Sequence, residues 1–364
     1  MNRPAKLRVA LLFGGQSAEH EISILSARNV LAALDPQRFE AVLVGIDRQG
    51  RWLRQDGARL LESARDPRLV RIEDGPPVSK EMIFAGAAPG AIDVIFPVLH
   101  GTMGEDGTVQ GLFELAGIPY VGAGVLGSAI GMDKDVSKRL LRDAGIPIAA
   151  FHTLRRERFE ADPAAALAPA QDLGLPVFTK PANAGSSIGV RKVRAQADLE
   201  AAVRHAFQFD DKVLIEAAVT AREIELAVLG GEPPAVSVAG EIVVRHPDGF
   251  YSYDAKYLDE SGARLELPAH LSPEVLRRAQ AMAVRSFEVL ECEGMARVDL
   301  FLESDGTLRV NEINTLPGFT AISMYPKLWE LSGIAPRALV TRLIDLALER
   351  ARRRAALKRS AGEL

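Results

Sequence analysis

RVDLFLESDGTLRVNEINTLPG, residues 297–318, is typical of two β-strands joined by a tight turn. Apolar residues dominate both halves of this stretch, and Asp305-Gly306 lies between them. An Asp-Gly pair between two such runs is the strongest short-range signal for a two-residue β-hairpin turn. In that turn Ser304 pairs with Thr307, and this pairing fixes which residues lie opposite each other along the strands. The stretch therefore predicts a hairpin of defined register.

The predicted register brings acidic and amide side chains together on one face of the hairpin. Asp299 lies directly opposite Glu312, and Arg297 lies opposite Asn314. Directly opposed residues have Cβ atoms about 4.5–5.5 Å apart, and residues two positions apart on a strand share a face. Two carboxylates at that separation repel unless a proton, a base or a hard cation compensates, and oxygen ligands of this kind suit Mg²⁺ or Mn²⁺. Arg297 is able to neutralise one of the two.

A ladder of surface ion pairs is the alternative interpretation of this face, because opposite charges across exposed strands are common. That alternative leaves the apolar neighbours less well explained, namely Leu300, Phe301, Val310 and Ile313. A sheet that carries carboxylates and an amide among such neighbours favours a metal-phosphate site.

Length and composition limit the class of protein. The 364 residues favour two or three domains. With 48% hydrophobic residues, 25% charged residues and a net charge of −4, we expect a soluble globular protein without general affinity for nucleic acid. Cys292 is the only cysteine, which excludes an intrachain disulfide and favours a reducing compartment. Since no run approaches the roughly 18 apolar residues of a membrane span and no signal peptide is evident, we expect a cytoplasmic protein that binds no membrane.

The first part of the chain alternates β-like and helical patterns. An apolar run at 7–15 ends in paired glycines and precedes a helical pattern over about 22–34. Further β-like runs occur at 40–47 and 92–101. Strands alternating with helices predict a parallel α/β domain to about residue 125, with a ligand crevice at the carboxyl ends of its strands.

The middle of the chain predicts a second compact unit. A helix around 137–147 ends at a glycine and a proline, and two strands within 175–193 precede a helix near 196–207 and a strand at 212–217. The alanine- and proline-rich stretch 157–171 is interpreted as a surface insertion.

The C-terminal end of the chain is strongly basic. The sequence LERARRRAALKRS, residues 348–360, predicts the end of an amphipathic helix. Its charges are interpreted as a solvated face and not as a binding arm.

Candidate phosphate-binding residues surround KPANAGSSIGV, residues 180–190. Lys180 precedes a Gly/Ser-rich turn whose backbone can approach phosphate oxygens closely, although an ordinary turn is the alternative. It is not a Walker loop, because the G-x-x-x-x-G-K-[ST] spacing is absent. Lys134 is a second candidate cation, or else a surface helix charge. Glu216 and Glu223 are candidates to accept from a nucleotide, with a solvated acidic loop as the alternative.

Candidate substrate-binding residues occur in two glycine-rich segments and one aromatic loop. HGTMGEDGTVQG, residues 100–111, places His100 and Glu105 among four glycines, although His100 is equally well explained as a local hydrogen-bond anchor. Glu19 stands just before a helix, where the macrodipole already favours a carboxylate. The segment YSYDAKY, residues 251–257, is either a loop that closes over a site or an ordinary surface loop.

Taken in order, these motifs resemble those of the D-alanine–D-alanine ligase family of ATP-grasp enzymes over nearly the whole chain. The segments that carry the resemblance are GGQSAEHEIS (14–23), HGTMGEDGTVQG (100–111), KPANAGSSIGV (180–190), YDAKY (253–257), ARVDLFL (296–302) and NEINTLPGFT (311–320). The resemblance implies a mixed α/β (α+β) ATP-grasp fold with three domains. These would be an N-terminal parallel α/β domain at 1–125, a central subdomain at 126–215, and a C-terminal subdomain at 216–364 that carries the metal site and the closing loop.

The resemblance implies roles for residues at the matching positions. Two Mg²⁺ or Mn²⁺ ions would be held by Asp299, Glu312 and Asn314. ATP would lie between the central and C-terminal domains. Lys134 and Lys180 would contact its phosphates, and Lys256 its γ-phosphate. Glu216 and Glu223 would contact the adenine side and the ribose. The first D-alanine would bind Glu19, which with Ser186 and Tyr257 would form a hydrogen-bonded set that closes the loop. The remaining substrate and oxyanion contacts would come from His100, Arg297, Gly318 and Ser323.

The implied reaction has two steps and serves the synthesis of peptidoglycan precursors. The carboxylate of one D-alanine takes the γ-phosphoryl group of ATP, and the amine of a second D-alanine attacks the acylphosphate. D-alanine and ATP are thus the expected partners, together with a second copy of the chain in a homodimer. A ligase that joins D-alanine to D-lactate or D-serine is the nearest alternative, and a nucleotide-binding protein without catalysis is a more distant one. A dehydrogenase is disfavoured because G-x-G-x-x-G is absent.

Overall fold

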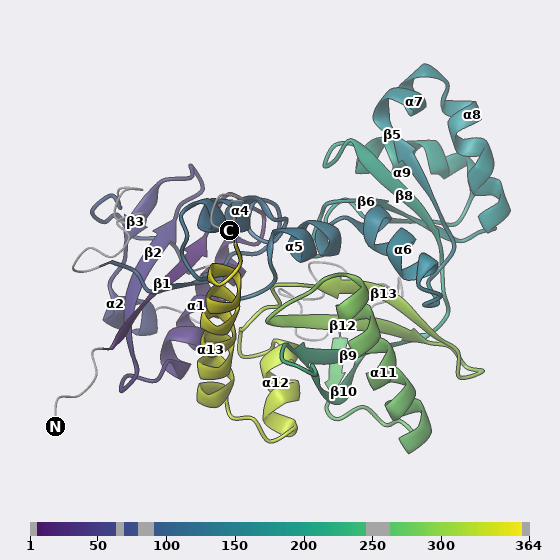
Figure 1. Ribbon diagram of the computed structural model, residues 1–364. Coiled ribbons are helices and arrows are strands. Elements are labelled where there is room, and N and C mark those ends of the chain that lie inside the picture. Colours follow the sequence, from purple (N-terminus) through teal and green to yellow (C-terminus); the bar gives the residue numbers. More distant parts are fainter. Residues whose placement is uncertain (1–5, 63–68, 79–90, 245–262, 359–364) are drawn as a thin grey trace.

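The computed structural model describes residues 6–62, 69–78, 91–244 and 263–358, and the strands of these residues form three sheets (Figure 1). The strand orders are β3-β2-β1-β4, β5-β8-β6-β7 and β11-β10-β9-β12-β13. The first sheet comes from the N-terminal part of the chain, the second from the centre, and the third from the C-terminal part. None of the described helices is long and apolar enough to cross a membrane.

The N-terminal sheet is built on three parallel strands, as the sequence predicts. β1 pairs in parallel with β2 and β4, and the short β3 adds an antiparallel edge. β1 is buried almost throughout because it lies between two strands and is covered by helices, which explains its continuous apolar run. The elements of this part are β1 (Leu7–Gly14), α1 (His20–Ala33), β2 (Phe39–Ile46), β3 (Trp52–Arg54), α2 (Gly57–Glu62), β4 (Val94–Val98) and α4 (Thr108–Leu115).

The central sheet is antiparallel and carries helices of its own. Figure 1 shows it with α7 (Arg156–Ala161), α8 (Pro163–Leu167) and α9 (Leu199–Ala206) at the end of the molecule away from the N-terminal sheet. The predicted strand pair and the following helix are present. The elements are α5 (Val125–Met132), α6 (Lys134–Asp143), β5 (Phe151–Arg155), β6 (Val177–Pro181), β7 (Arg191–Val193), η2 (Gln196–Asp198), α9 (Leu199–Ala206) and β8 (Lys212–Ala217).

The alanine-rich stretch 157–171 lies mostly at the surface, as predicted, but three of its residues anchor it to the central core. It folds into α7 (Arg156–Ala161), α8 (Pro163–Leu167) and η1 (Ala168–Leu173). Phe159, Leu167 and Ala170 are buried in the same apolar cluster as the strands of the central sheet. The composition concealed this because one large apolar residue per turn is enough to anchor so short a helix.

The third sheet is antiparallel and has a helix on each face. Alternate residues of β9 point to opposite sides, so that Leu226 packs with α11 while Ala227 packs with α12. The elements are β9 (Arg222–Leu229), β10 (Ala235–Val244), β11 (Ala263–Glu266), α11 (Pro273–Val289), β12 (Met295–Leu302), β13 (Leu308–Asn314), α12 (Met324–Leu331) and α13 (Pro336–Ala355). The limits 125 and 215 between domains remain predictions; β8, which belongs to the central sheet, ends at Ala217.

The predicted hairpin is present as β12 and β13, but its turn is one residue longer than predicted. The N–H of Glu303 donates to the carbonyl of Thr307 at 2.9 Å, so three residues connect the strands. Gly306 has φ +85°, and its N–H donates to the carbonyl of Glu303 at 3.0 Å. A three-residue loop that ends in a left-handed glycine is the next most common hairpin connection. The two-residue turn is therefore wrong.

A β-bulge restores the predicted register beyond this turn. Asn311 has no counterpart in β12, and the pairing shifts by one residue between Asp299 and Leu300. Because the extra residue in β13 offsets the extra residue in the turn, Asp299 lies opposite Glu312, as predicted. The predicted pairing of Arg297 with Asn314 is confirmed in the same way.

The basic end of α13 is not simply a solvated face. Arg350 is only 5% exposed, and its guanidinium donates to the carbonyls of Gly122 and Tyr120, both at 2.6 Å. Arg354 pairs with Glu293 at 3.2 Å. The solvated-face interpretation is therefore wrong for Arg350, which ties the last helix to the end of the N-terminal part.

Candidate active site

A cavity of about 90 Å³ lies where the three parts of the chain meet. Eight of the residues predicted for the site line it, namely Glu19, His100, Ser186, Arg297, Glu312, Asn314, Gly318 and Ser323. A smaller pocket shares Glu312 and Asn314 with it and adds Lys134. Two predicted residues, Lys256 and Tyr257, lie outside the described residues.

Glu19 is placed by a tight turn at the carboxyl end of β1. Gly14 has φ +90°, and a Cβ there would lie 2.2 Å from the carbonyl oxygen of Ile46, so no larger residue fits. The N–H of Gly14 donates to the hydroxyl of Ser23 at 2.7 Å, which draws α1 onto the strand. Glu19, just before α1, thus lies at the sheet edge where the predicted ligand crevice was expected.

The Gly/Ser loop of the central part closes onto Glu19. The hydroxyl of Ser186 donates to the carboxylate of Glu19. A Cβ on Gly185 would lie 2.8 Å from the same carboxylate, so the close approach depends on glycine. Ser186 itself has φ +49°, which is uncommon for a residue with a side chain. Two members of the predicted hydrogen-bonded set are therefore in contact.

His100 is a hydrogen-bond anchor as well as a lining residue. Its Nδ1 lies 3.1 Å from the carbonyl of Leu316, and its Nε2 lies 3.3 Å from the hydroxyl of Ser26. Burial lowers the pKa of His100, which favours the neutral ring. Because a carbonyl only accepts, the neutral ring carries its proton on Nδ1 and accepts from Ser26. His100 thereby fixes the end of the C-terminal hairpin to α1.

Glu105, which the glycine-rich motif placed among the candidates without a specific role, is a second buried carboxyl group beside Glu19. Its Oε1 accepts from the N–H of Gly101 at 2.8 Å. Burial, and then the negative charge of Glu19, raise the pKa of Glu105 to about 8. A pocket with two carboxyl groups and a raised pKa has a place for a cation, and an ammonium group would relieve the repulsion. The motif HGTMGEDG was the available signal for this residue.

The predicted metal-binding face is assembled around Asp299. The guanidinium of Arg297 donates to both carboxylate oxygens of Asp299, at 2.7 and 2.6 Å. The amide of Asn314 donates to Asp299 at 3.2 Å. Burial alone would lower the pKa of Arg297, but Asp299 and Glu225 hold it above its ordinary value. Arg297 remains charged and neutralises part of the face, as its predicted position allows.

The donor set fits a hard divalent cation that shares its ligands with a nucleotide. Two carboxylates and one amide, from Asp299, Glu312 and Asn314, lie on one face of the hairpin. Among the described residues no group of three or more His, Cys, Asp or Glu side chains could hold a metal ion by itself. Mg²⁺ commonly binds one or two carboxylates and completes its shell with water and substrate phosphates. The residues therefore fit an ion that arrives with ATP.

Glu225 is a buried carboxylate of this face that the sequence did not single out. It lies on β9 directly opposite Asp299, is 4% exposed, and pairs with Arg297 Nε at 3.0 Å. The available signal was its spacing, since Glu225 follows Glu223 by two residues in an otherwise apolar strand. Glu223 is half-buried, and its charge helps to raise the pKa of Lys180.

Two buried lysines share the carboxylate of Glu216. Lys138 and Lys180 each place Nζ 2.6 Å from a different oxygen of Glu216. Burial alone would raise the pKa of Glu216, but the two ammonium groups lower it to about 2. Each carboxylate oxygen of Glu216 is thus paired with an ammonium group. The contact of Glu216 with the adenine side of ATP remains a prediction. Lys138 was missed, although it lies one helical turn after Lys134.

Lys134 connects the Gly/Ser loop with the metal-binding face. Its Nζ donates to the carbonyl of Ala184 at 2.7 Å and lies 3.7 Å from Glu312 Oε2. Its backbone N–H donates to the carbonyl of Ala182 at 3.0 Å. The cation therefore stands between the loop and the carboxylates, where phosphate oxygens would be bound by both.

Ser323 and Gly318 form a compact turn at the opposite side of the cavity. The hydroxyl of Ser323 accepts from the N–H of Thr320 at 2.9 Å, and a Cβ on Gly318 would lie 2.8 Å from that hydroxyl. Ser323 directly precedes α12, so backbone N–H groups of the first helical turn are available to a carboxylate. Ile322 is 53% exposed beside it.

Sheets joined around a cavity that carries lysines, a Gly/Ser loop and a hard-oxygen donor set define an enzyme of the ATP-grasp fold. Its solved relatives agree. The D-alanine-D-alanine ligase from Coxiella burnetii is 37% identical, with a TM-score of 0.83 over 96% of both chains. The VanG D-Ala:D-Ser ligase from Enterococcus faecalis is 32% identical, with a TM-score of 0.79 over 94% of this chain and 100% of that one.

Sequence comparison makes the assignment more particular. The family described as D-ala D-ala ligase N-terminus matches residues 8–123, and D-ala D-ala ligase C-terminus matches residues 140–345. D-alanine--D-alanine ligase A from Chromobacterium violaceum is 53% identical over 98% of this chain and 99% of that protein. The chain belongs to the D-alanine–D-alanine ligase family. The fold and the family predicted from the sequence are confirmed.

Proposed function

We propose that the protein joins two D-alanine molecules into D-alanyl-D-alanine, with conversion of ATP to ADP and phosphate, for peptidoglycan precursor synthesis. One observation carries the proposal: a single cavity is lined at one side by Glu19 and Ser186 and at the other by Arg297, Glu312 and Asn314. An ammonium-binding carboxylate and a phosphoryl-transfer face thus meet in one space. Family membership supports the same reaction.

The phosphate side is assigned to the lysines and the donor set of the hairpin. Mg²⁺ or Mn²⁺, bound as two ions by Asp299, Glu312 and Asn314, would supply charge neutralisation at the phosphoryl oxygens. Lys134 and Lys180 orient the phosphates, and Lys134 already bridges the loop and Glu312. Phosphoryl transfer depends mostly on such positioning and electrostatic stabilisation.

The substrate side is assigned to the N-terminal residues. Glu19 holds the ammonium of the first D-alanine, and the neighbouring Glu105 gives up its proton as that cation enters, because the cation stabilises the carboxylate form. Ser186 keeps the Gly/Ser loop on Glu19 and covers the first substrate. The carboxylate of this D-alanine then faces the phosphoryl group.

The second step requires stabilisation of a negative tetrahedral oxygen. Arg297 remains charged because Asp299 and Glu225 hold it, and it lines the cavity together with Gly318. A fixed guanidinium and a backbone N–H near Gly318 are suitable donors for that oxygen. Ser323, at the start of α12, is assigned to the carboxylate of the second D-alanine. Exclusion of water, which an acylphosphate requires, is assigned to the segment that contains Lys256 and Tyr257.

A ligase that takes D-serine as its second substrate is the alternative, since one solved relative is named a D-Ala:D-Ser ligase. The test is product analysis with Mg-ATP and D-alanine, D-lactate and D-serine in competition. We expect D-alanyl-D-alanine as the main product and phosphate release that rises with D-alanine. A main product that contains D-serine or D-lactate supports the alternative. Nucleotide binding without release of phosphate identifies a protein without catalysis and contradicts the proposal.

The oligomeric state is a separate part of the proposal. The family resemblance favours a homodimer, and sedimentation of the purified protein tests it. A single species at the mass of one chain, 39.3 kDa, contradicts it.

A further inference from the structure

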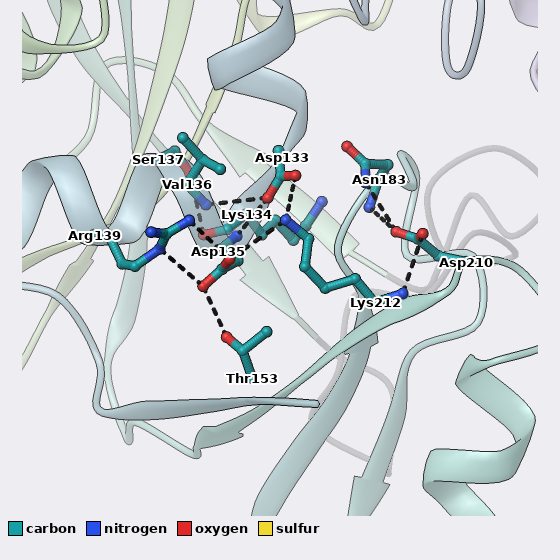
Figure 2. A network of polar contacts seen from close by, with 10 residues as sticks. All are labelled: Asp133, Lys134, Asp135, Val136, Ser137, Arg139, Thr153, Asn183, Asp210 and Lys212. Atoms are coloured by element: carbon teal, nitrogen blue, oxygen red, sulfur yellow. Dashed lines mark hydrogen bonds and ion pairs between the residues drawn. The ribbon is translucent and has the colours of Figure 1, made fainter. Parts of the chain in front are cut away.

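Lys212, at the start of β8, is a buried lysine that no part of the mechanism uses. It is 4% exposed, and its Nζ contacts the carboxylate of Asp133 and lies 3.3 Å from Asp135 Oδ2. Figure 2 shows Lys212 reaching from β8 toward the two carboxylates. A buried cation is costly unless it is paired, so both contacts matter to its placement.

The two carboxylates stand on either side of Lys134 in the sequence. Oδ1 of Asp133 accepts from the N–H groups of Asp135 and Val136, at 3.1 and 3.0 Å, and so caps α6. Oδ1 of Asp135 accepts from the hydroxyl of Thr153 at 2.8 Å. Lys212 pairs with both carboxylates and so ties the residues on either side of Lys134 to the start of β8.

The backbone of Lys212 also supports the start of the Gly/Ser loop. Its carbonyl accepts from the N–H of Ala182 at 2.9 Å, and the carbonyl of Ala182 accepts from the N–H of Lys134 at 3.0 Å. The side chain of Lys134 then returns to the carbonyl of Ala184 at 2.7 Å. Lys212 is therefore connected to Lys134 in two ways. Its side chain pairs with the neighbours of Lys134, and its carbonyl is linked to the backbone of Lys134 through Ala182.

Asp210 completes this connection two residues before Lys212. Its carboxylate accepts from the N–H and the side-chain amide of Asn183, at 2.8 and 3.0 Å, and from the N–H of Lys212 at 3.3 Å (Figure 2). The first residues of the loop, 182–184, are thus bonded either to the segment 210–212 or to Lys134 itself.

We propose that Lys212 is a positioning residue for the phosphates of ATP. It holds Asp133 and Asp135 so that α6 begins with Lys134 in a fixed position relative to the Gly/Ser loop. Lys212 itself touches no ligand. The inference rests on the proposed function, which makes Lys134 a phosphate ligand.

The test compares Lys212→Met and Lys212→Arg with Arg139→Met. Arg139 is a matched control because it pairs with Asp135 at 3.1 Å, but from an exposed position. The measurements are kcat, the KM values for ATP and for D-alanine, and the Kd of Mg-ADP by calorimetry. We expect Lys212→Met to raise both the KM for ATP and the Kd of Mg-ADP about tenfold, with the KM for D-alanine unchanged. Lys212→Arg recovers part of the affinity, and Arg139→Met keeps it.

Two outcomes overturn the proposal. One is wild-type nucleotide affinity in folded Lys212→Met. The other is an equal rise in both KM values, which indicates a merely structural role. If Lys212→Met does not fold, Asp133→Asn decides, because asparagine still caps the helix but loses the ion pair. That variant is expected to raise the KM for ATP about threefold, and an unchanged KM overturns the proposal. Failure of the proposed function looks different, because the wild type then makes no dipeptide while Mg-ADP binding still reports on Lys212.

Discussion

The N-terminal and C-terminal sheets share one apolar core, whereas the central sheet has a core of its own and is joined to them by α5, α6 and the Gly/Ser loop. Val9, Leu11 and Phe13 of β1 belong to the same cluster as residues of β9, α12 and α13. The cluster around the central sheet, by contrast, contains none of the described residues of the other two sheets. Leu141 of α6 packs with the C-terminal sheet, but the contacts at the cavity are polar, namely the ion pair of Lys134 with Glu312 and the hydrogen bond of Ser186 to Glu19.

The difference separates two tasks of the molecule. A shared apolar core holds residues at a fixed spacing, because packed interiors resist deformation. It therefore keeps Glu19 in place relative to the hairpin with Asp299 and Glu312. Charged contacts can exchange one partner for another, so that a lysine paired with a carboxylate can turn to phosphate when ATP enters. The following variants test this division, from the largest expected effect to the smallest.

Glu312→Gln removes a negative charge from the polar contacts between the central part and the C-terminal sheet. The fold should remain, because Glu312 is only partly buried and glutamine has the same shape. We expect Mg²⁺-dependent turnover to fall by about 10²–10³-fold, since charge neutralisation at the phosphoryl group is lost. Steady-state phosphate release measures this. Glu303→Gln is the control, because Glu303 pairs with Arg309 near the turn of the same hairpin. Retained activity of Glu312→Gln contradicts the metal assignment.

Lys138→Met tests the shared carboxylate of Glu216. With Lys138 gone, Lys180 is the cation that remains on Glu216 among the residues that the structure describes, so less of Lys180 is available to phosphate. We expect the KM for ATP to rise about tenfold, and the free energy of unfolding to fall by about 3–5 kcal/mol because one partner of a buried ion pair is removed. Urea unfolding and initial rates measure the two effects. Lys192→Met, on the short edge strand of the same sheet, should change neither.

Arg350→Met tests the packing between the N-terminal and C-terminal parts of the chain through the free energy of unfolding. Arg350 donates to the carbonyls of Tyr120 and Gly122, which lose their partner in the variant. We expect the free energy of unfolding to fall by about 2–4 kcal/mol, because two buried carbonyls are left unpaired. The KM for ATP should stay the same. Arg353→Met is the control, since Arg353 is 67% exposed. A change of ATP affinity without loss of stability would contradict the division.

The hairpin illustrates how far the sequence leads to the candidate site. Alternation and Asp305-Gly306 predicted that Asp299 and Glu312 face each other, and they do. The turn is longer than predicted, and the bulge at Asn311 compensates for it. A bulge shifts the alternation by one residue, and β13 carries that mark: the buried residues Leu308 and Val310 alternate regularly, but two consecutive polar residues separate Val310 from Ile313. The pairing was therefore predicted correctly although neither the longer turn nor the bulge was predicted, because the two features offset each other.

Residues whose partners are distant in sequence were the ones missed. Glu225 was passed over because its importance comes from Arg297, on a neighbouring strand. Lys138 depends in the same way on Glu216, and Arg350 on carbonyls more than 200 residues away. A motif identifies residues that act on a ligand, but a buried ion pair becomes visible only once two elements are packed together.

The pH dependence of stability tests the acidic pair at the cavity. Burial and Glu19 raise the pKa of Glu105 to about 8 from an ordinary 4.5, so the folded protein keeps a proton that the unfolded chain loses. The stability that this group contributes is present below about pH 4.5 and is lost as the pH rises toward 8. In the metal-free, substrate-free protein we expect a decline of up to about 1.4 kcal/mol per pH unit in this window. Urea unfolding of Glu105→Gln should show a shallower decline, and an identical slope contradicts the assignment.

Gly185→Ala probes the point where the central loop approaches the N-terminal part. An added Cβ would lie 2.8 Å from Glu19 Oε2, so either the loop or the carboxylate must shift by a few tenths of an ångström. Gly185 does not have a positive φ, so the effect comes from this contact and not from backbone strain. We expect the KM for D-alanine to rise about threefold, with ATP affinity and the thermal midpoint unchanged. Gly111→Ala is the matched control, because no atom lies within 4 Å of its added Cβ. If Gly185→Ala instead weakens ATP binding, the position of the loop affects the phosphates more than Glu19. The polar contacts of the central part then act on both ATP and D-alanine, and the division into two tasks is wrong.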